Sequence, residues 1–132
     1  MQVKKEILDA SLVLIDDSPT SLKLFTSILQ GAGFHRILTF EDESQALVYL
    51  FTHSPDLVLL DMILHKTTAV EILKTLRNNI NTRHLPLIVL SHSSDNALII
   101  QCLELGAEDF IPKKSNPIEI LVRINNILFI NF

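Results

Sequence analysis

The chain has little of what several classes of protein require. Its 132 residues include a single cysteine, Cys102, no tryptophan and three glycines. One thiol cannot form a disulfide within the chain, which excludes a disulfide-stabilised scaffold and fits a reducing compartment. The hydrophobic runs are too short to span a membrane, and the opening residues, MQVKKEILDA, do not form a signal peptide. We therefore expect a soluble, cytoplasmic protein without a membrane partner.

Basic residues are also too few for a nucleic-acid-binding surface. Eleven lysines and arginines stand against fifteen acidic residues, so the net charge is −4, and no basic cluster exceeds a pair. Because nucleic-acid binding needs a basic face, no direct contact with nucleic acid is expected. Hydrophobic residues, in contrast, make up 48% of the chain. That supply is sufficient for the core of one domain over residues 1–132.

Short hydrophobic runs alternate five times with segments of helical periodicity. The strand-like runs are LVLID at 12–16, RILTF at 36–40, LVLLD at 57–61, LIVLS at 87–91 and DFI at 109–111. Between them, hydrophobic residues recur about every 3.6 positions, as in helices. Helix-start patterns occur at Ser18-Pro19, at Thr68 with Glu71, and at Asn116-Pro117. Strands that are hydrophobic on both faces indicate a parallel sheet covered by helices on both sides, an α/β sandwich.

Polar residues follow the predicted strands at their carboxyl ends. Asp16 and Asp17 end the first strand, Asp61 the third and Ser91 the fourth, and Lys113 follows the fifth. In parallel α/β sheets the ligands bind at this edge, so the five side chains should gather there. A single acid at a strand end is usually structural. Three acids, a hydroxyl and a lysine, each at its own strand, are hard to obtain by accident.

The chemistry of these residues favours phosphoryl transfer. Three adjacent carboxylates repel one another, so at least one should be protonated or the cluster should hold a cation. Oxygen ligands suit Mg²⁺, which takes one or two carboxylates and keeps several waters. With its charge offset by the metal and Lys113, Asp61 can act as a nucleophile and form an aspartyl phosphate. Ser91 and Lys113 would then contact the oxygens of the transferred group.

Four segments, taken in order, resemble the receiver domain of two-component response regulators over essentially the whole chain. They are VLIDDSPT, PDLVLLDMIL, PLIVLS and GAEDFIPK. The resemblance implies the flavodoxin-like (βα)5 fold, a three-layer sandwich with parallel sheet order 2-1-3-4-5. It also implies that Asp61 is the phosphoacceptor and that Asp17 binds Mg²⁺ directly. Asp16 would act on the ion through water, and the backbone carbonyl of Ile63 would be the remaining protein ligand.

The resemblance assigns signalling roles as well. Ser91 matches the hydroxyl that senses the phosphoryl group, and Lys113 matches the lysine of the family. Phe110 matches the aromatic switch residue, whose ring moves inward when the hydroxyl engages the phosphoryl group. The implied partner is a histidine kinase or a phosphotransfer protein. We expect a signalling module with autocatalytic phosphoryl transfer and autodephosphorylation at most, rather than an enzyme.

Four positions depart from the usual residues of the family. His65 and Ala69 replace a proline and a glycine after the phosphoacceptor, His92 is unusually bulky, and Lys114 replaces a proline whose peptide bond is usually cis. A cis bond before a non-proline residue costs about 2.5–4 kcal/mol, so we expect a trans bond with a shifted Lys113 or a strained cis bond. No chemical group is lost, so phosphorylation should survive with altered kinetics and switching. The other histidines, at positions 35, 53, 65 and 84, lack metal-ligand spacing and should be solvated.

The last predicted helix has two hydrophobic stripes. The stripe expected to be buried consists of Ile120, Ile124 and Ile127. The stripe expected to face outward, together with Ile99 of the preceding helix, consists of Ile118, Leu121, Val122 and Phe129. Such a patch usually marks an interaction site, here for homodimerisation or for docking a partner or an output domain. An ordinary surface with scattered hydrophobic residues is the alternative.

Two other functions are compatible with the same pattern. A pseudo-receiver would keep the fold and act only as a protein-interaction scaffold; the altered loop favours this weakly, and the retained acids, hydroxyl and lysine argue against it. A metal-dependent phosphohydrolase of related topology usually needs a second acid two positions after the nucleophile. Ile63 occupies that position here. The sequence names neither the kinase nor the input signal nor the output.

Overall fold

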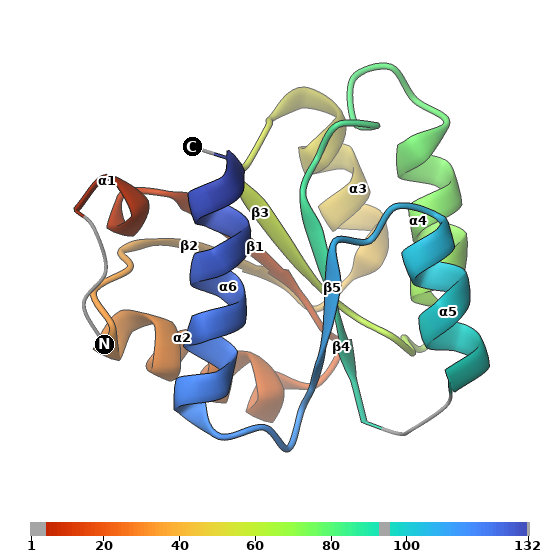
Figure 1. Cartoon of the computed structure of the whole chain (residues 1–132). Helices are drawn as coiled ribbons and strands as arrows, with labels where there is room; N and C mark the ends of the chain where they lie inside the picture. Colours follow the sequence, from red (N-terminus) through yellow and green to blue (C-terminus); the bar gives the residue numbers. More distant parts are fainter. Residues whose placement is uncertain (1–4, 93–95, 132) are drawn as a thin grey trace.

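A five-stranded parallel sheet forms the centre of the computed structural model, which describes residues 5–92 and 96–131. The strand order is β2-β1-β3-β4-β5 (Figure 1), as the family resemblance implied. Three of the predicted strands match at both ends, and β1 begins and ends one residue earlier than expected. The strands are β1 (Ser11–Ile15), β2 (Arg36–Phe40), β3 (Leu57–Asp61), β4 (Leu87–Ser91) and β5 (Asp109–Pro112).

Helices cover both faces of this sheet, so the fold has the three layers that were predicted. α1 (Lys5–Leu8), α2 (Pro19–Gly31) and α6 (Pro117–Asn131) lie on one side in Figure 1. On the other side lie α3 (Glu43–Thr52), α4 (Ala69–Arg77) and α5 (Asn96–Glu104). No helix in the described parts of the chain is long and apolar enough to cross a membrane.

The central strands feed two hydrophobic cores by strict alternation. In β3, Val58 and Leu60 enter the core beneath α3, α4 and α5, whereas Leu57 and Leu59 enter the core beneath α2 and α6. All four side chains are fully buried, and each contributes roughly 1.5–3 kcal/mol by leaving water. Because successive side chains of a strand point to opposite faces, the same alternation decides on which side each residue of the functional site lies.

Two of the three predicted helix starts have the expected side-chain caps. The Ser21 backbone N–H donates to Ser18 Oγ at 3.2 Å, and the Glu119 N–H donates to Asn116 Oδ1 at 2.9 Å. Each bond satisfies one of the free N–H groups at a helix start. Thr68 precedes α4 as predicted, but its side chain makes no capping bond, so the predicted capping box is wrong.

Backbone bonds close the loop between β3 and α4 instead. Ile63 and Thr68 form an isolated antiparallel bridge, and the Ala69 N–H donates to the Met62 carbonyl at 2.9 Å. Within the described residues, only Gly33 and Gly106 have positive φ. Ala69 therefore takes the place of the usual glycine without a left-handed backbone, which its side chain would disfavour.

The prediction for the outward stripe is wrong at Ile99 and only partly right for α6. Ile99 lies on α5 and is buried, in the core that also holds Cys102. The two residues are three positions apart and share the inward face of the helix. The exposed hydrophobic residues of α5 are Ile100 and Leu103 instead.

On α6, the predicted buried stripe of Ile120, Ile124 and Ile127 is confirmed. In the other stripe, Leu121 is half-buried and packs against the core beneath α2. It lies seven residues before the fully buried Leu128, so the two side chains leave the helix in nearly the same direction. The residues of the predicted outward stripe that are exposed are Ile118, Val122 and Phe129.

Candidate functional site at the carboxyl edge of the sheet

The strand ladder continues one residue past three strand ends and fixes the backbone of the site. The Asp16 N–H donates to the Phe40 carbonyl at 3.0 Å, and the Lys113 N–H donates to the Ser91 carbonyl at 2.8 Å. The residue after Asp61 is held in the same way by the end of β4. The predicted site residues therefore start from a rigid edge, which is the lower edge of the sheet in Figure 1.

Strand alternation places Asp16, Asp61 and Lys113 on the same side of this edge. Each stands two positions after a residue that is buried beneath α2 and α6. Those preceding residues are Leu14, Leu59 and Ile111. Ser91 stands one position after Leu90 of that same core, so its side chain belongs to the opposite side. The site is thus divided between the two layers of helices.

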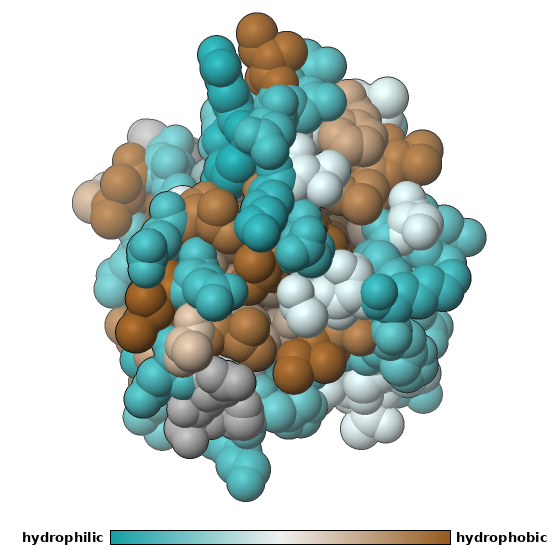
Figure 2. Space-filling model, turned by 90° about the vertical axis from the view of Figure 1, so that its right-hand side faces the viewer, coloured by the Kyte–Doolittle hydropathy of each residue, from teal (hydrophilic) through white to brown (hydrophobic). Residues whose placement is uncertain are grey.

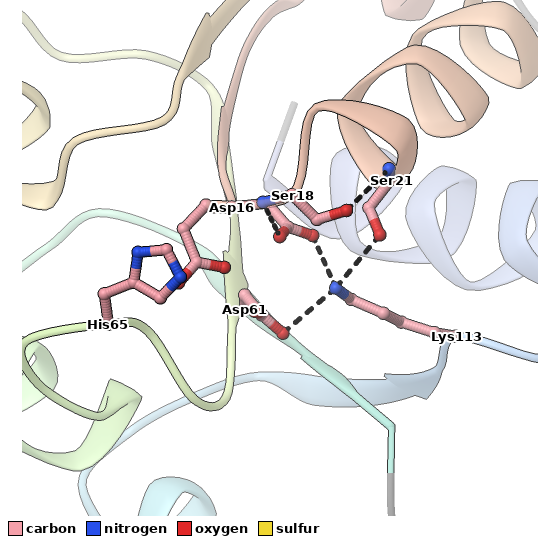
Figure 3. A network of polar contacts seen from close by, with 7 residues as sticks. Asp16, Ser18, Ser21, Asp61, His65 and Lys113 are labelled. Atoms are coloured by element: carbon pink, nitrogen blue, oxygen red, sulfur yellow. Dashed lines mark hydrogen bonds and ion pairs between the residues drawn. The ribbon is translucent and has the colours of Figure 1, made fainter.

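On the α2 side, the Lys113 ammonium contacts three oxygen atoms (Figure 3). Its Nζ lies 2.5 Å from Asp16 Oδ2, 3.2 Å from Asp61 Oδ1 and 3.3 Å from Ser21 Oγ. The side chains of the lysine and of both acids are at most 5% exposed. The sequence predicted that Lys113 and the acids would meet, but it did not identify Ser21.

The neighbouring acid, Asp17, has a partner that was not predicted. His65 Nε2 lies 3.4 Å from Asp17 Oδ2, although the imidazole is 83% exposed (Figure 3). The expectation that His65 is solvated is therefore correct for its exposure and misses its contact with the acid. His65 belongs to the loop between β3 and α4, and nothing in its sequence spacing indicates a contact with the end of β1.

The three acids fit a divalent cation. One carboxylate oxygen from each of Asp16, Asp17 and Asp61 lies within 4.8 Å of the others. They line a pocket of about 320 Å³ together with Ile63 and Lys113. Oxygen ligands beside space for water are what Mg²⁺ requires. The part of the Ile63 carbonyl as a ligand stays a prediction.

The electrostatics of Asp61 reflect this crowding. Burial raises the pKa of its carboxyl group from 3.8 to about 6, and the negative charge of Asp16 adds to the effect. The Lys113 ammonium opposes both by stabilising the charged form. The predicted repulsion between the acids thus appears as a weakened acidity of the central one. At neutral pH, Asp61 is still mostly ionised and available as a nucleophile.

On the opposite side of the edge, Ser91 and Phe110 border an open space. Ser91 is buried and Phe110 is half-buried, and both line a cavity of about 240 Å³ with Ile99. Arg123 of α6 contacts the phenylalanine: its Nη1 donates to the Phe110 carbonyl at 3.1 Å, and its Cζ lies 5.8 Å from the ring centre. His92 lines both this cavity and the acidic pocket.

The substitution at Lys114 does not displace the neighbouring lysine. No cis peptide bond occurs within residues 5–92 and 96–131, so the bond before Lys114 is trans. The Lys113 ammonium nevertheless reaches Asp61. Of the two expected outcomes, the trans bond is found, but the lysine keeps its contact with the acid.

Comparison with known proteins decides the family. The family model of the response regulator receiver domain matches residues 12–125. The chain belongs to this family. Among the relatives of the receiver is the DNA-binding response regulator MtrA of Mycolicibacterium smegmatis, 31% identical over 86% of this chain and 48% of that protein. The transcriptional regulatory protein CpxR of Klebsiella pneumoniae is 36% identical over 89% of this chain and 48% of that protein.

A solved structure agrees with the fold. A candidate response regulator from Chloroflexus aurantiacus superimposes with a TM-score of 0.84 at 27% identity, over 92% of this chain and 98% of that one. The receiver spans about half the length of the curated relatives it matches. It is thus a receiver domain of the kind found in two-component signalling, and its cluster of Asp16, Asp17 and Asp61 fits the phosphorylation site of such domains.

Proposed function

We propose that the receiver takes up a phosphoryl group on Asp61, from a histidine kinase or a phosphotransfer protein and with Mg²⁺ bound. The observation that carries the proposal is the setting of this carboxylate. It is buried at the end of β3, grouped with Asp16 and Asp17, contacted by the Lys113 ammonium, and it lines a pocket. The chain would act as one domain over residues 1–132. Its charge and its single thiol support a cytoplasmic protein that does not itself bind nucleic acid.

The residues of the site suggest how the transfer proceeds. One oxygen of the Asp61 carboxylate forms a bond to phosphorus while the bond from phosphorus to the donor atom breaks, and the electron pair leaves with the donor. Asp17, Asp61 and the Ile63 carbonyl would hold Mg²⁺, with Asp16 acting through water, and the bound ion would supply positive charge to the phosphoryl oxygens. Lys113 is close enough to Asp61 to contact those same oxygens as they arrive.

The Ser91 side of the site would transmit the change. The Ser91 hydroxyl turns toward the phosphoryl group, and the Phe110 ring enters the cavity that both residues line. Arg123 and the exposed surface of α5 and α6 would sense this movement, because Arg123 contacts both the ring and the backbone of Phe110.

We also propose that the exposed hydrophobic residues beside this switch form an interaction surface. They are Ile100 and Leu103 on α5 and Ile118, Val122 and Phe129 on α6. Figure 2, which views the side formed by α4 and α5, shows hydrophobic residues between the hydrophilic ones there. The surface would serve homodimerisation, or docking of a partner or an output domain.

Sedimentation of a matched pair of variants tests this surface. Val122→Asp should shift the protein toward the monomer, whereas Val48→Asp on α3 should not, since Val48 is exposed on a different helix. If wild type and Val122→Asp sediment identically as monomers at high concentration, the receiver does not dimerise through α6. A partner or an output domain would then be the remaining occupant.

The two alternative functions find less support. A phosphohydrolase lacks its usual second acid, because Ile63 is apolar and its side chain is exposed. A pure scaffold would have no use for a buried lysine between two acids, since burying charged groups is costly. The interaction surface is compatible with both a scaffold and a phosphoacceptor, so phosphorylation itself must be measured.

The deciding experiment is incubation with Mg²⁺ and acetyl phosphate, followed by mass spectrometry. Wild type and Asp9→Asn, a control at an exposed acid, should each gain one acid-stable, base-labile phosphoryl group. Asp61→Asn should gain none. The absence of any gain on wild type would refute the proposal and favour the scaffold. Rapid turnover of unrelated phosphate esters would instead favour a hydrolase.

A further inference from the structure

We propose that Ser21 is a positioning residue for phosphoryl transfer, because its hydroxyl holds the Lys113 ammonium between Asp16 and Asp61. This inference rests on the proposed function and adds a residue to its machinery. Ser21 lies in the first turn of α2. The serine contacts the lysine only because the β1–α2 connection and the end of β5 meet at the same edge of the sheet (Figure 3).

The hydrogen-bond donors of the lysine match the oxygen atoms around it in number. An ammonium group has three N–H donors and no acceptor. The Lys113 side chain is 5% exposed, and three oxygen atoms surround its Nζ: one from Asp16, one from Asp61 and the hydroxyl of Ser21. Each donor therefore has one acceptor. A buried charged group left with an unsatisfied donor is costly, so the Ser21 hydroxyl stabilises the ammonium by accepting its third hydrogen bond.

Ser21 is itself fixed in place by hydrogen bonds. Its backbone N–H donates to Ser18 Oγ at 3.2 Å, and the Ser18 N–H donates to Asp16 Oδ1 at 2.9 Å. Since Asp16 Oδ2 accepts from Lys113, these contacts close a ring through Asp16, Ser18, Ser21 and Lys113. The ring joins the end of β1, the first turn of α2 and the residue after β5. The hydroxyl is thus presented to the lysine by the same cap that starts the helix.

The contact between Ser21 and Lys113 can outlast the change at Asp61 during the reaction. When one oxygen of Asp61 bonds to phosphorus, the carboxylate loses its charge and becomes a poorer partner for the ammonium. The contacts with Asp16 and Ser21 do not involve the reacting atoms, so they can persist throughout the transfer. Two of the three N–H groups stay bound, and the third points from Asp61 toward the incoming oxygens. Ser21 would therefore keep the lysine oriented at the moment its charge is needed.

Three variants test the role of the hydroxyl. Ser21→Ala removes it, Ser21→Thr retains it, and Ser27→Ala is the matched control at an exposed position of the same helix. Alanine is a good helix former, so the fold should persist, which the thermal midpoint would verify. We expect Ser21→Ala to lower the rate of Asp61 phosphorylation at saturating acetyl phosphate about 3–10-fold, since the lost bond is the longest of the three. The half-saturating concentration of acetyl phosphate should change less than twofold.

Ser21→Thr and Ser27→Ala should react within about twofold of wild type. The inference is overturned if Ser21→Ala also reacts within about twofold of wild type. It is overturned as well if Ser21→Thr is as slow as Ser21→Ala. A second readout is the NMR signal of the Lys113 ammonium without phosphodonor. It should be sharp in wild type and broadened in Ser21→Ala, because a proton without an acceptor exchanges faster with water. An unchanged signal would also overturn the inference. If wild type takes up no phosphoryl group, the proposed function fails, and this signal still tests the contact.

Discussion

The two halves of the site differ in the contacts that hold them. On the α2 side lies what we call the closed half: Asp16, Asp61 and Lys113 are buried and bound to one another, and Ser21 completes the network. On the α5 side lies what we call the open half: Ser91 and the half-buried Phe110 border a cavity of about 240 Å³. Both halves are built on the same strand edge. A shift of one position along a strand decides to which half a residue belongs.

This difference separates chemistry from response. Breaking a network of buried charges is expensive, so the α2 side should hold its geometry while the reaction proceeds. The α5 side has room for a side chain to move, and filling a cavity gains packing. We expect phosphorylation to leave the first half nearly unchanged and to rearrange the second.

The largest effect is expected from removing the lysine at the centre of the closed half. Lys113→Met leaves Asp16 and Asp61 facing each other without a cation, and should lower the free energy of unfolding at pH 7 by about 2–4 kcal/mol. Lys114→Met, at the exposed neighbouring lysine, should change it by less than about 0.5 kcal/mol. Urea denaturation measures both. Equal effects of the two substitutions would show that the closed half is not held by its charges.

Removing the central acid, Asp61, should instead raise the free energy of unfolding at pH 7. Burial raises the pKa of Asp61 to about 6, so in the folded state this group binds its proton more tightly than in the unfolded state. Its contribution to stability is full below about pH 4 and is lost as the pH rises through 6. The span from 3.8 to about 6 corresponds to at most about 3 kcal/mol.

Asp61→Asn should therefore stabilise the fold at pH 7, by about 1–2 kcal/mol once the lost contact with Lys113 is subtracted. The gain should largely disappear at pH 3, where the aspartate is mostly protonated in both the folded and the unfolded state. Urea denaturation at the two pH values checks this. A gain of the same size at both would contradict the assigned cause.

Mg²⁺ should stabilise wild type through the same acids. At a concentration ten times its dissociation constant, the ion should raise the free energy of unfolding by about 1.4 kcal/mol. Asp17→Asn should lose this increase, and Asp9→Asn should keep it, because Asp9 lies on the exposed surface. Thermal unfolding with and without the ion compares the three proteins. If Mg²⁺ stabilises Asp17→Asn as much as wild type, the ion does not bind at Asp17.

The smallest energetic effect should come from the open half, where a spectroscopic change is the better readout. The chain contains no tryptophan, so Phe110→Trp supplies a single fluorophore at the edge of the cavity. Its emission should change when Mg²⁺ and beryllium fluoride, a mimic of the phosphoryl group, are added together. The change should be lost when Ser91→Ala is combined with it. A fluorescence change that persists in the Ser91→Ala background would show that the side chain at position 110 responds independently of the Ser91 hydroxyl.

The sequence was sufficient for the parts of the receiver that depend on backbone periodicity. The strand ranges follow from short hydrophobic runs, and parallel pairing brings Asp16, Asp61 and Lys113 to one edge whatever their separation along the chain. Even β1, whose limits differ by one residue, leaves Asp16 in place, because its N–H continues the ladder to Phe40.

The sequence was insufficient where side chains from different elements meet. Ser21 and His65 contact the site from a helix turn and a loop, and no periodic pattern marks such contacts. The position of Ser21 in the turn that follows the paired acids was the one available indication. The sequence also did not determine which face of α5 is buried, because hydrophobic residues occur on both of its faces. Packing buries Ile99 and exposes Ile100.

The most direct test of the division between a closed and an open half is a crystal structure with Mg²⁺ and beryllium fluoride. The account predicts that the fluoride adduct lies on Asp61 and that Lys113 still contacts Asp16 and Ser21. It also predicts that Phe110 occupies the cavity beside Ser91. A structure in which the lysine has left Asp16 while the phenylalanine ring keeps its position over Arg123 would contradict the account.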